Sequence, residues 1–337
     1  MQKLISIVIP VYNTLAYLEE AINSVLIQSD FIKDIIIIND GSTDKSGELL
    51  GKKYGKNQLV EILHTENFGQ GHARNIGIEK AKGEFIYCFD SDDILVPGLF
   101  ENFYSHLEKE KEIELFCFSG DSFLDKNFDK KLVKNQSLFK EDTYKRKTTT
   151  LLPSGEEAFN FLIKNRAFFP GPPFYIFKKS ICIKNNIQFE EIRYEDEEFT
   201  TKLFLNSGKT FITKDVFFRR RVRVGSTMQI RRNFKDIEGY LRNIESLEIL
   251  ISKSNLLEET KSLLLTRIHN FLKLIIIIKV VDKIKLSKFQ KKILDKSIKP
   301  YLCTNNDLRI FYYRYPIEHQ IRNIKSKFLD FIKFISK

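Results

Sequence analysis

Cysteine is scarce in this 337-residue sequence, and its four cysteines stand far apart. None of Cys88, Cys117, Cys182 and Cys303 forms a Cys-x-x-Cys pair with another, which argues against a zinc site or a disulfide framework. A reducing compartment is the simpler interpretation.

Long apolar runs are missing as well. The run at 274–278 is interrupted by Lys273 and Lys279 and is far shorter than the ~20 residues that a membrane-spanning helix needs. The first residues have neither the long apolar stretch nor the cleavage site of a signal peptide. We therefore expect a cytoplasmic protein that is soluble or bound to a membrane surface.

A glycine-rich dinucleotide-binding turn is also absent. Where such a turn would follow the first strand, the chain has Pro10-Val11-Tyr12-Asn13. Proline and tyrosine cannot replace glycines that a phosphate approaches closely. This disfavours a dinucleotide-dependent oxidoreductase.

Positive charge is in excess but unevenly placed. The net charge is +11, and residues 261–337 hold 18 Lys and Arg against 5 Asp and Glu. Charge alone would suggest a nucleic-acid-binding protein, but a basic-aromatic recognition motif is lacking and the excess lies outside the half that carries motifs. We expect no nucleic-acid partner.

The order of apolar patterns predicts an α/β fold. Continuous β-branched runs at 5–11 and 34–38 are typical of strands buried on both faces, and 16–28 between them has helical spacing. Further strands are expected at 60–63, 84–89 and 115–118, helices at 73–82, 97–111 and 154–164, an irregular Lys-rich stretch at 121–150 and a rigid turn at 170–173. The series predicts a mostly parallel, doubly wound sheet flanked by helices, with ligands at the carboxyl ends of the strands. We expect one domain over 1–225 and a basic, mainly helical extension over 226–337.

Two acidic sites follow predicted strands. Asp40 comes directly after the second strand, where it could accept a hydrogen bond from a base or ribose, or instead cap the next helix. Asp90, Asp92 and Asp93 follow the strand at 84–89. Crowded carboxylates repel one another unless a cation such as Mg²⁺ or Mn²⁺ neutralises them, and such an ion typically bridges carboxylates to nucleotide phosphates. The alternative is a solvated acidic turn.

Five motifs follow one another within the first hundred residues: SIVIPVYN at 6–13, NDGSTD at 39–44, EN-x-G at 66–69, ARN-x-G at 73–77 and FDSDD at 89–93. Together they resemble the family 2 glycosyltransferases with the A-type fold. The resemblance implies that the donor nucleotide is bound by Pro10, Tyr12, Asn13, Asp40, Arg74, Asp90 and Ser91. It also implies that Asp90 and Asp92 form the pair that engages the metal ion, Mn²⁺ or Mg²⁺. His72 departs from the pattern, since a small residue usually stands there.

Inverting members of this family use a carboxylate as general base, which takes a proton from the acceptor hydroxyl. The resemblance places this base in YEDEEF at 194–199, with Asp196 as the first candidate and Glu195 as the second. The alternative is that the acidic cluster favours a helix N-terminus through the helix dipole.

A run of arginines, RRRVRVGST at 219–227, is expected to follow a strand and looks like the family's Arg-x-x-x-x-Ser element. One guanidinium group can bind two phosphate oxygens at once, so Arg221 or Arg223 is expected to close over the donor diphosphate. The alternative is a solvated basic run.

The resemblance implies an inverting glycosyltransferase that moves a hexosyl or N-acetylhexosaminyl group from a nucleotide sugar, with UDP expected. The acceptor would be a glycan or lipid-linked glycan of a bacterial capsule, lipooligosaccharide or related polysaccharide. The C-terminal helices could pack on the catalytic domain, contact anionic phospholipid or mediate homo-oligomerisation. Mixed Lys and apolar spacing at 321–337 favours peripheral binding to the inner membrane face.

Overall fold

The computed structural model describes residues 2–126, 142–223, 231–253 and 255–335. They fall into two compact units, one of Met1–Glu191 with Glu195–Gln229 and one of Ile192–Tyr194 with Ile230–Lys337. The domain boundary predicted between residues 225 and 226 lies outside the described residues.

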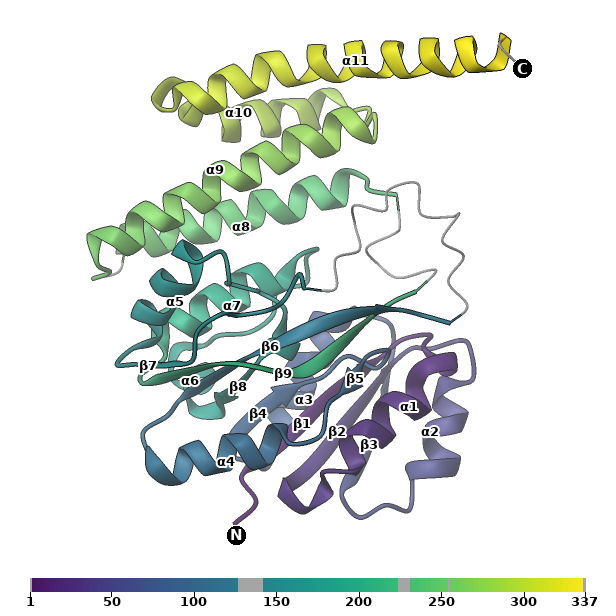
Figure 1. Ribbon diagram of the computed structural model, residues 1–337, viewed down its shortest axis with the longest axis vertical. Coiled ribbons are helices and arrows are strands. Elements are labelled where there is room, and N and C mark those ends of the chain that lie inside the picture. Colours follow the sequence, from purple (N-terminus) through teal and green to yellow (C-terminus); the bar gives the residue numbers. More distant parts are fainter. Residues whose placement is uncertain (1, 127–141, 224–230, 254, 336–337) are drawn as a thin grey trace. The chain divides into compact units, whose positions relative to one another are not determined.

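The first unit is built on one mixed sheet with helices packed on it (Figure 1). Its described strands are β1 (Ile5–Val11), β2 (Ile32–Asp40), β3 (Val60–Thr65), β4 (Phe85–Cys88), β5 (Ile94–Leu95), β6 (Leu115–Leu124), β7 (Thr150–Leu152), β8 (Tyr175–Lys178) and β9 (Thr210–Val222). Their order is β3-β2-β1-β4-β8-β6-β9-β5, and β7 pairs with β9. The first four strands are parallel neighbours, as are β6 and β9, whereas β8 is antiparallel to β4 and β6. The predicted α/β fold with a mostly parallel, helix-flanked sheet is confirmed.

The helices of this unit connect the strands. They are α1 (Leu15–Leu26), α2 (Ser46–Tyr54), α3 (Gln70–Lys80), α4 (Leu99–Lys109), α5 (Gly155–Lys164), α6 (Lys179–Asn185) and α7 (Glu195–Asn206), with short 3₁₀ turns at Ser29–Phe31 and Pro172–Phe174. The Ser154 hydroxyl caps α5 by accepting a hydrogen bond from the Glu157 amide.

The central strands are buried along their whole length, which explains their continuous apolar sequence. Every residue of β1 is buried, and β2 has a single exposed position, Lys33. Because parallel strands here are covered by helices, both side-chain directions must be apolar.

One expectation about the chain after β6 was wrong. The irregular stretch predicted from residue 121 begins later, because β6 continues to Leu124 beside β9. Polar residues remain in the strand because they find partners across it: Asp121 lies opposite Arg219 and accepts from its Nε at 3.1 Å. Residues 127–141 of the predicted stretch lie outside the described chain.

Close packing of α3 on the sheet depends on Gly77. A Cβ atom at this position would lie 2.2 Å from Cγ1 of Val8 and 2.9 Å from Cδ1 of Ile38. The missing side chain lets the α3 backbone approach β1 and β2, and it thereby sets the position of Arg74 and Gln70 one and two turns earlier on the same helix.

The second unit is helical, which confirms the predicted C-terminal helical region. Its helices are α8 (Phe234–Lys253), α9 (Glu258–Val281), α10 (Lys288–Thr304) and α11 (Asn306–Ile335). Packing joins α8 to α9, α9 to α11 and α10 to α11. Within the described chain, none of the helices combines the length and apolar character needed to cross a membrane.

The segment Ile192–Tyr194 belongs to this helical unit although it lies before α7 in the chain. The Tyr194 ring stacks on Tyr240 with 4.3 Å between centroids, and its hydroxyl donates to Asp236 at 3.0 Å. Asn243 donates from Nδ2 to the Tyr194 carbonyl oxygen at 3.1 Å. Tyr194 itself has φ of +62°, which is uncommon for a residue with a side chain.

Candidate active site at the carboxyl ends of the parallel strands

The carboxyl ends of β2, β1 and β4 lie side by side, since these strands are parallel neighbours. The residues that follow them include Asn13 after β1 and Asp90 after β4, and Asp40 ends β2. The sheet therefore brings three of the predicted donor-binding segments to one edge.

Asn13 joins the loops after β1 and β2. It has φ of +50°, donates its amide to the Ser42 hydroxyl at 3.1 Å and accepts from the Thr43 amide at 2.8 Å. Pro10 is buried inside β1, whereas Tyr12 is 50% exposed. Of these predicted donor residues, Tyr12 is the one that offers a large side-chain surface to a ligand.

Asp40 does not cap the next helix, so that alternative is wrong. Its carboxylate is buried and accepts from the amides of Phe68 and Gly69, each at 2.9 Å. The start of α2 is held instead by Asp44, which accepts from the Ser46 amide at 3.0 Å. Asp40 thus fixes the loop between β3 and α3 at the edge of the predicted nucleotide pocket.

The acidic turn after β4 is held by arginines on two sides. Asp90 Oδ1 lies 2.8 Å from Nη2 of Arg74, and Asp92 Oδ2 lies 2.7 Å from Nε of Arg223. Asp93 is buried and accepts from the Arg221 amide at 2.6 Å. The predicted picture of a solvated acidic turn does not describe Asp93, which lies inside the protein.

Ser91 is buried between these aspartates. Its hydroxyl is 3.0 Å from the hydroxyl of Thr14. The structure therefore places this predicted donor-binding side chain against the start of α1.

The carboxylates of this turn are partly or fully buried and lie close enough to repel one another. Burial, with Asp90 adding to it, raises the pKa of the Asp92 carboxyl despite the opposing effect of Arg223. Burial and the charge of Asp92 raise the pKa of Asp93 well above its usual range. A cation at this turn would relieve that repulsion.

The donor set suits a hard divalent cation. Asp90 and Asp92 are 31% and 22% exposed at their side chains, and each arginine contact engages one oxygen of its partner. In the described residues, no group of three or more His, Cys, Asp or Glu side chains could hold a metal by itself. Mg²⁺ and Mn²⁺ sites in nucleotide enzymes commonly use one or two carboxylates and complete their coordination with phosphates and water, so the two aspartates fit such an ion.

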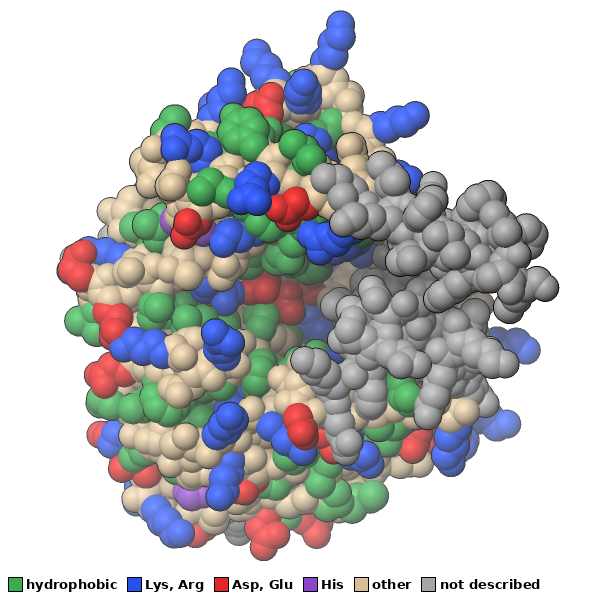
Figure 2. Space-filling view, turned by 45° about the horizontal axis from the view of Figure 1, so that its top comes forward, with side chains coloured by type: hydrophobic (Ala, Val, Ile, Leu, Met, Phe, Trp, Pro, Cys, Tyr) green, Lys and Arg blue, Asp and Glu red, His purple; other side chains and the backbone are tan. Residues whose placement is uncertain are grey.

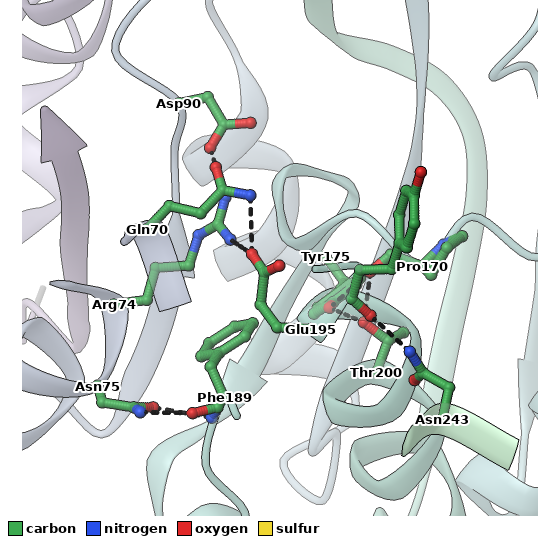
Figure 3. A network of polar contacts seen from close by, with 11 residues as sticks. Gln70, Arg74, Asn75, Asp90, Pro170, Tyr175, Phe189, Glu195, Thr200 and Asn243 are labelled. Atoms are coloured by element: carbon green, nitrogen blue, oxygen red, sulfur yellow. Dashed lines mark hydrogen bonds and ion pairs between the residues drawn. The ribbon is translucent and has the colours of Figure 1, made fainter. Parts of the chain in front are cut away.

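Arg74 links the acidic turn to α7 (Figure 3). Its guanidinium is 2% exposed and contacts Asp90 through Nη2 and Glu195 through Nη1, the latter at 3.1 Å. It also lies over the Phe189 ring, 5.3 Å from the centroid. Burial acts against the charged guanidinium, but Asp90 and Glu195 outweigh it and raise the pKa of Arg74 further above its usual range.

Gln70 is a member of this network that the sequence analysis missed. Its Nε2 donates to Glu195 Oε1 at 2.7 Å, the same oxygen that Arg74 contacts (Figure 3). Gln70 precedes Arg74 by four residues on α3, so the two share one face of the helix. The helix predicted at 73–82 begins after Gln70, so the sequence prediction could not place the two residues on one helical face.

The two candidate bases differ in their surroundings. Glu195 is buried and tied to α3, while Asp196 is partly exposed. Burial first, then the charges of Glu195 and Glu197, raises the pKa of Asp196 to about 8. Both residues stand in the first turn of α7, so a favourable effect on the helix N-terminus acts alongside any chemical role.

The arginine run lies inside a strand rather than after one, which corrects the prediction: Arg219, Arg220 and Arg221 belong to β9. Arg221 is 6% exposed at its side chain, and its Nε donates to the Asp92 carbonyl oxygen at 2.9 Å. Its Nη2 reaches Glu20 at 2.5 Å. Ser226, the end of the predicted element, lies outside the described residues.

Tyr17 is a second residue that sequence reasoning missed. The guanidinium groups of Arg221 and Arg223 lie 5.1 Å and 5.0 Å from the centroid of its ring. Its hydroxyl donates to Asp125 at 3.3 Å. No local motif marks Tyr17, because the contact joins α1 to a strand some two hundred residues later.

Comparison with known proteins agrees with this geometry. The family model described as Glycosyl transferase family 2 matches residues 6–184, more than half of the chain. Glycosyltransferase GlyG of Streptococcus pneumoniae serotype 4 is 32% identical over 232 residues, which are 68% of this chain and 74% of that protein. The cholesterol galactosyltransferase of Borreliella burgdorferi is 25% identical over 267 residues, 77% of this chain and 70% of that protein.

Solved structures share the fold at lower sequence identity. S. aureus TarS 1–349 in complex with UDP-GlcNAc has a TM-score of 0.65 at 19% identity and covers 95% of this chain and 92% of its own. The mannosyltransferase PcManGT from Pyrobaculum calidifontis, in complex with GDP-Man and Mn²⁺, has a TM-score of 0.52 at 14% identity, with 96% and 87% covered.

The aspartates after β4, the arginine beneath them and the acidic start of α7 thus lie in a chain that matches one family model over most of its sheet. The chain belongs to glycosyl transferase family 2 and has the A-type glycosyltransferase fold.

Proposed function

We propose that this protein is an inverting glycosyltransferase that uses a UDP-sugar and extends a surface glycan or lipid-linked glycan of a bacterium. One observation carries the proposal: Arg74 contacts both Asp90 of the donor turn and Glu195 beside the candidate base. A single buried side chain therefore connects the predicted donor-binding and acceptor-activating groups.

The transfer itself needs a base on one side of the sugar and charge stabilisation on the other. The acceptor hydroxyl oxygen forms a bond to the anomeric carbon while the bond from that carbon to the diphosphate oxygen breaks, and the hydroxyl proton passes to the Asp196 carboxylate. A pKa near 8 makes Asp196 a better proton acceptor than an ordinary aspartate.

The leaving diphosphate carries the developing negative charge. Asp90 and Asp92 would hold a divalent cation there, which supplies electrostatic stabilisation of the departing phosphates. Between the two candidate arginines we assign the diphosphate contact to Arg223. Its side chain is 14% exposed and, among the described residues, has one ion pair, with Asp92, whereas Arg221 is engaged by Glu20, Asp125 and the Asp92 carbonyl.

On the nucleotide side, Tyr12 offers its ring to the base, Asn13 joins the loops after β1 and β2, and Asp40 holds the loop between β3 and α3. The UDP-GlcNAc complex of TarS supports a uridine donor, and the GDP-Man complex of PcManGT supports Mn²⁺. The bacterial relative GlyG supports a bacterial acceptor. An oxidoreductase or a nucleic-acid-binding protein does not accord with the family.

The test is a screen of nucleotide sugars for Mn²⁺-dependent release of free nucleoside diphosphate by the purified chain. With the active donor identified, we expect Asp196→Asn to reduce transfer to the acceptor at least about 1,000-fold while donor binding, measured by calorimetry, stays within twofold. Glu190→Gln, an exposed carboxylate a few residues earlier, is the matched control and should retain full activity. Turnover by Asp196→Asn close to that of the control would reject Asp196 as the base.

A further inference from the structure

The outer side of α10 carries a dense row of lysines. Lys288, Lys291, Lys292, Lys296 and Lys299 line a shallow hollow together with a single acidic residue, Asp295. All five lysines are exposed, and none of them makes an ion pair within the part of the chain that the structure describes. Four of them, at spacings of four, four and three residues, form one stripe along the helix.

Two large apolar side chains stand beside this stripe. Phe289 is 72% exposed and Ile293 is 37% exposed. They are four residues apart, and each precedes a lysine of the stripe, Lys292 or Lys296, by three residues. The outer side of α10 is therefore both basic and apolar.

The bundle does not need these apolar groups for its own packing. Leu294 and Ile298, both 2% exposed, form the buried side of α10. Leaving a phenylalanine in water costs free energy that a polar residue would avoid, so the exposed pair points to a partner surface.

The chemistry of the stripe selects the partner. An anionic bilayer offers phosphates to lysines and an acyl boundary to Phe and Ile, and helices that lie in this interface combine these side chains. The phosphates of a nucleic acid would bind the lysines, but its charged backbone offers no apolar surface to an exposed isoleucine. A second copy docked through the same stripe would set lysines against lysines.

We propose that the outer side of α10 docks on an anionic phospholipid bilayer, with Phe289 and Ile293 entering the headgroup region and Lys288, Lys292, Lys296 and Lys299 contacting lipid phosphates. Figure 2 shows Lys and Arg side chains interspersed with hydrophobic ones on the face that it presents. The proposal names the residues that would carry the membrane association expected from the sequence. That association was assigned to 321–337, where most side chains lie outside the described residues.

Vesicle binding by the full chain tests the lysines. A variant with Lys288, Lys292, Lys296 and Lys299 all changed to Gln is compared with a control of equal charge in which four exposed lysines of the first unit, Lys33, Lys52, Lys56 and Lys111, are changed to Gln. Each lysine near an anionic surface contributes about fivefold to binding. On vesicles containing phosphatidylglycerol we expect the α10 variant to bind at least about 100-fold more weakly than the control, and neither to bind pure phosphatidylcholine well.

The apolar pair is tested by fluorescence, because the natural chain has no tryptophan. Phe289→Trp should show a blue-shifted emission on anionic vesicles and quenching by a quencher attached to the lipid acyl chains. Ile183→Trp, at a position of the first unit that is 69% exposed, should show neither effect.

Three results would overturn the proposal: equal vesicle binding by the two lysine variants, an unchanged Phe289→Trp emission while the chain binds vesicles, or binding of a DNA duplex with no binding to vesicles. Unchanged melting temperatures of the variants show that folding is intact. Because the donor assay needs no vesicles, failure here leaves the proposed sugar transfer untouched.

Discussion

At the scale of single residues, Arg74 and Gln70 contact one of two neighbouring carboxylates, which the sequence ranked only by resemblance, with Asp196 before Glu195. Both side chains donate to one oxygen of Glu195, and in the proposed reaction Glu195 is therefore a positioning residue. Asp196 keeps the raised pKa and the partial exposure that a base needs. The motif names both residues, and the hydrogen bonds from α3 to Glu195 give the two carboxylates different surroundings.

The pKa of Asp196 predicts a pH dependence. A base must be deprotonated, so kcat/KM for transfer should rise with pH and level off above about pH 8. Glu195→Gln keeps the size of the side chain and removes a negative charge, so it should lower the pKa of Asp196 and move the inflection to lower pH. Glu190→Gln should leave it in place. If Glu195→Gln left the inflection of the pH profile unchanged, the assignment of Asp196 as the base would be contradicted.

Substitutions of Asp92 and Arg223 should change the affinity for Mn²⁺ in opposite directions. A cation and a guanidinium compete for the same carboxylate, since Asp92 Oδ2 is 2.7 Å from Arg223 Nε. Calorimetry with Mn²⁺ on the nucleotide-free chain should show Arg223→Gln binding on the order of tenfold more tightly. Asp92→Asn should bind at least about tenfold more weakly.

The matched control for metal binding is Asp121→Asn, which removes a carboxylate paired with Arg219 in the same sheet. It should behave as the natural chain does. If Arg223→Gln weakened Mn²⁺ binding instead, the competition would be excluded.

At the scale of elements, the sequence predicted the first half of the sheet well because its signals are local. Buried parallel strands read as continuous apolar runs, and β1 matched its predicted range. Three short strands were not predicted: β5, of two residues, β7, of three residues, and β8, which begins immediately after a proline-rich turn. The arginines of β9 were placed after a strand because their pairing with β6 is made by residues distant in sequence.

The contact between α3 and β1 gives a prediction for stability. Gly77→Ala places a methyl group 2.2 Å from a carbon of Val8, and we expect a loss of about 1–3 kcal/mol in the free energy of unfolding, measured with denaturant. Because the helix carries Arg74, activity should fall as well. Gly51→Ala on α2 is the control: nothing lies within 4 Å of its added Cβ, so the higher helix propensity of alanine should leave stability unchanged or raise it by up to about 1 kcal/mol.

At the scale of the whole molecule, the sequence signalled two parts with different chemistry, motifs in the first and basic charge in the last. It gave no sign that Ile192–Tyr194 would join the helical unit, because the motif that begins at Tyr194 was assigned to the catalytic base and has no periodic pattern that marks packing on a helix. Their membership comes from contacts with α8 that only the folded chain creates.

Because Ile192–Tyr194 belong to the helical unit, shortening the chain at its C-terminus affects residues next to the candidate base. The chain leaves the sheet unit after residue 191, returns at Glu195 and leaves again after residue 229. Each unit is therefore made of two separate segments of the sequence. Deleting everything beyond β9 would strip Tyr194 of its stacking partner and both polar anchors, one residue before Glu195. A single truncation after the first unit therefore leaves Ile192–Tyr194 attached to that unit without the helices they pack on.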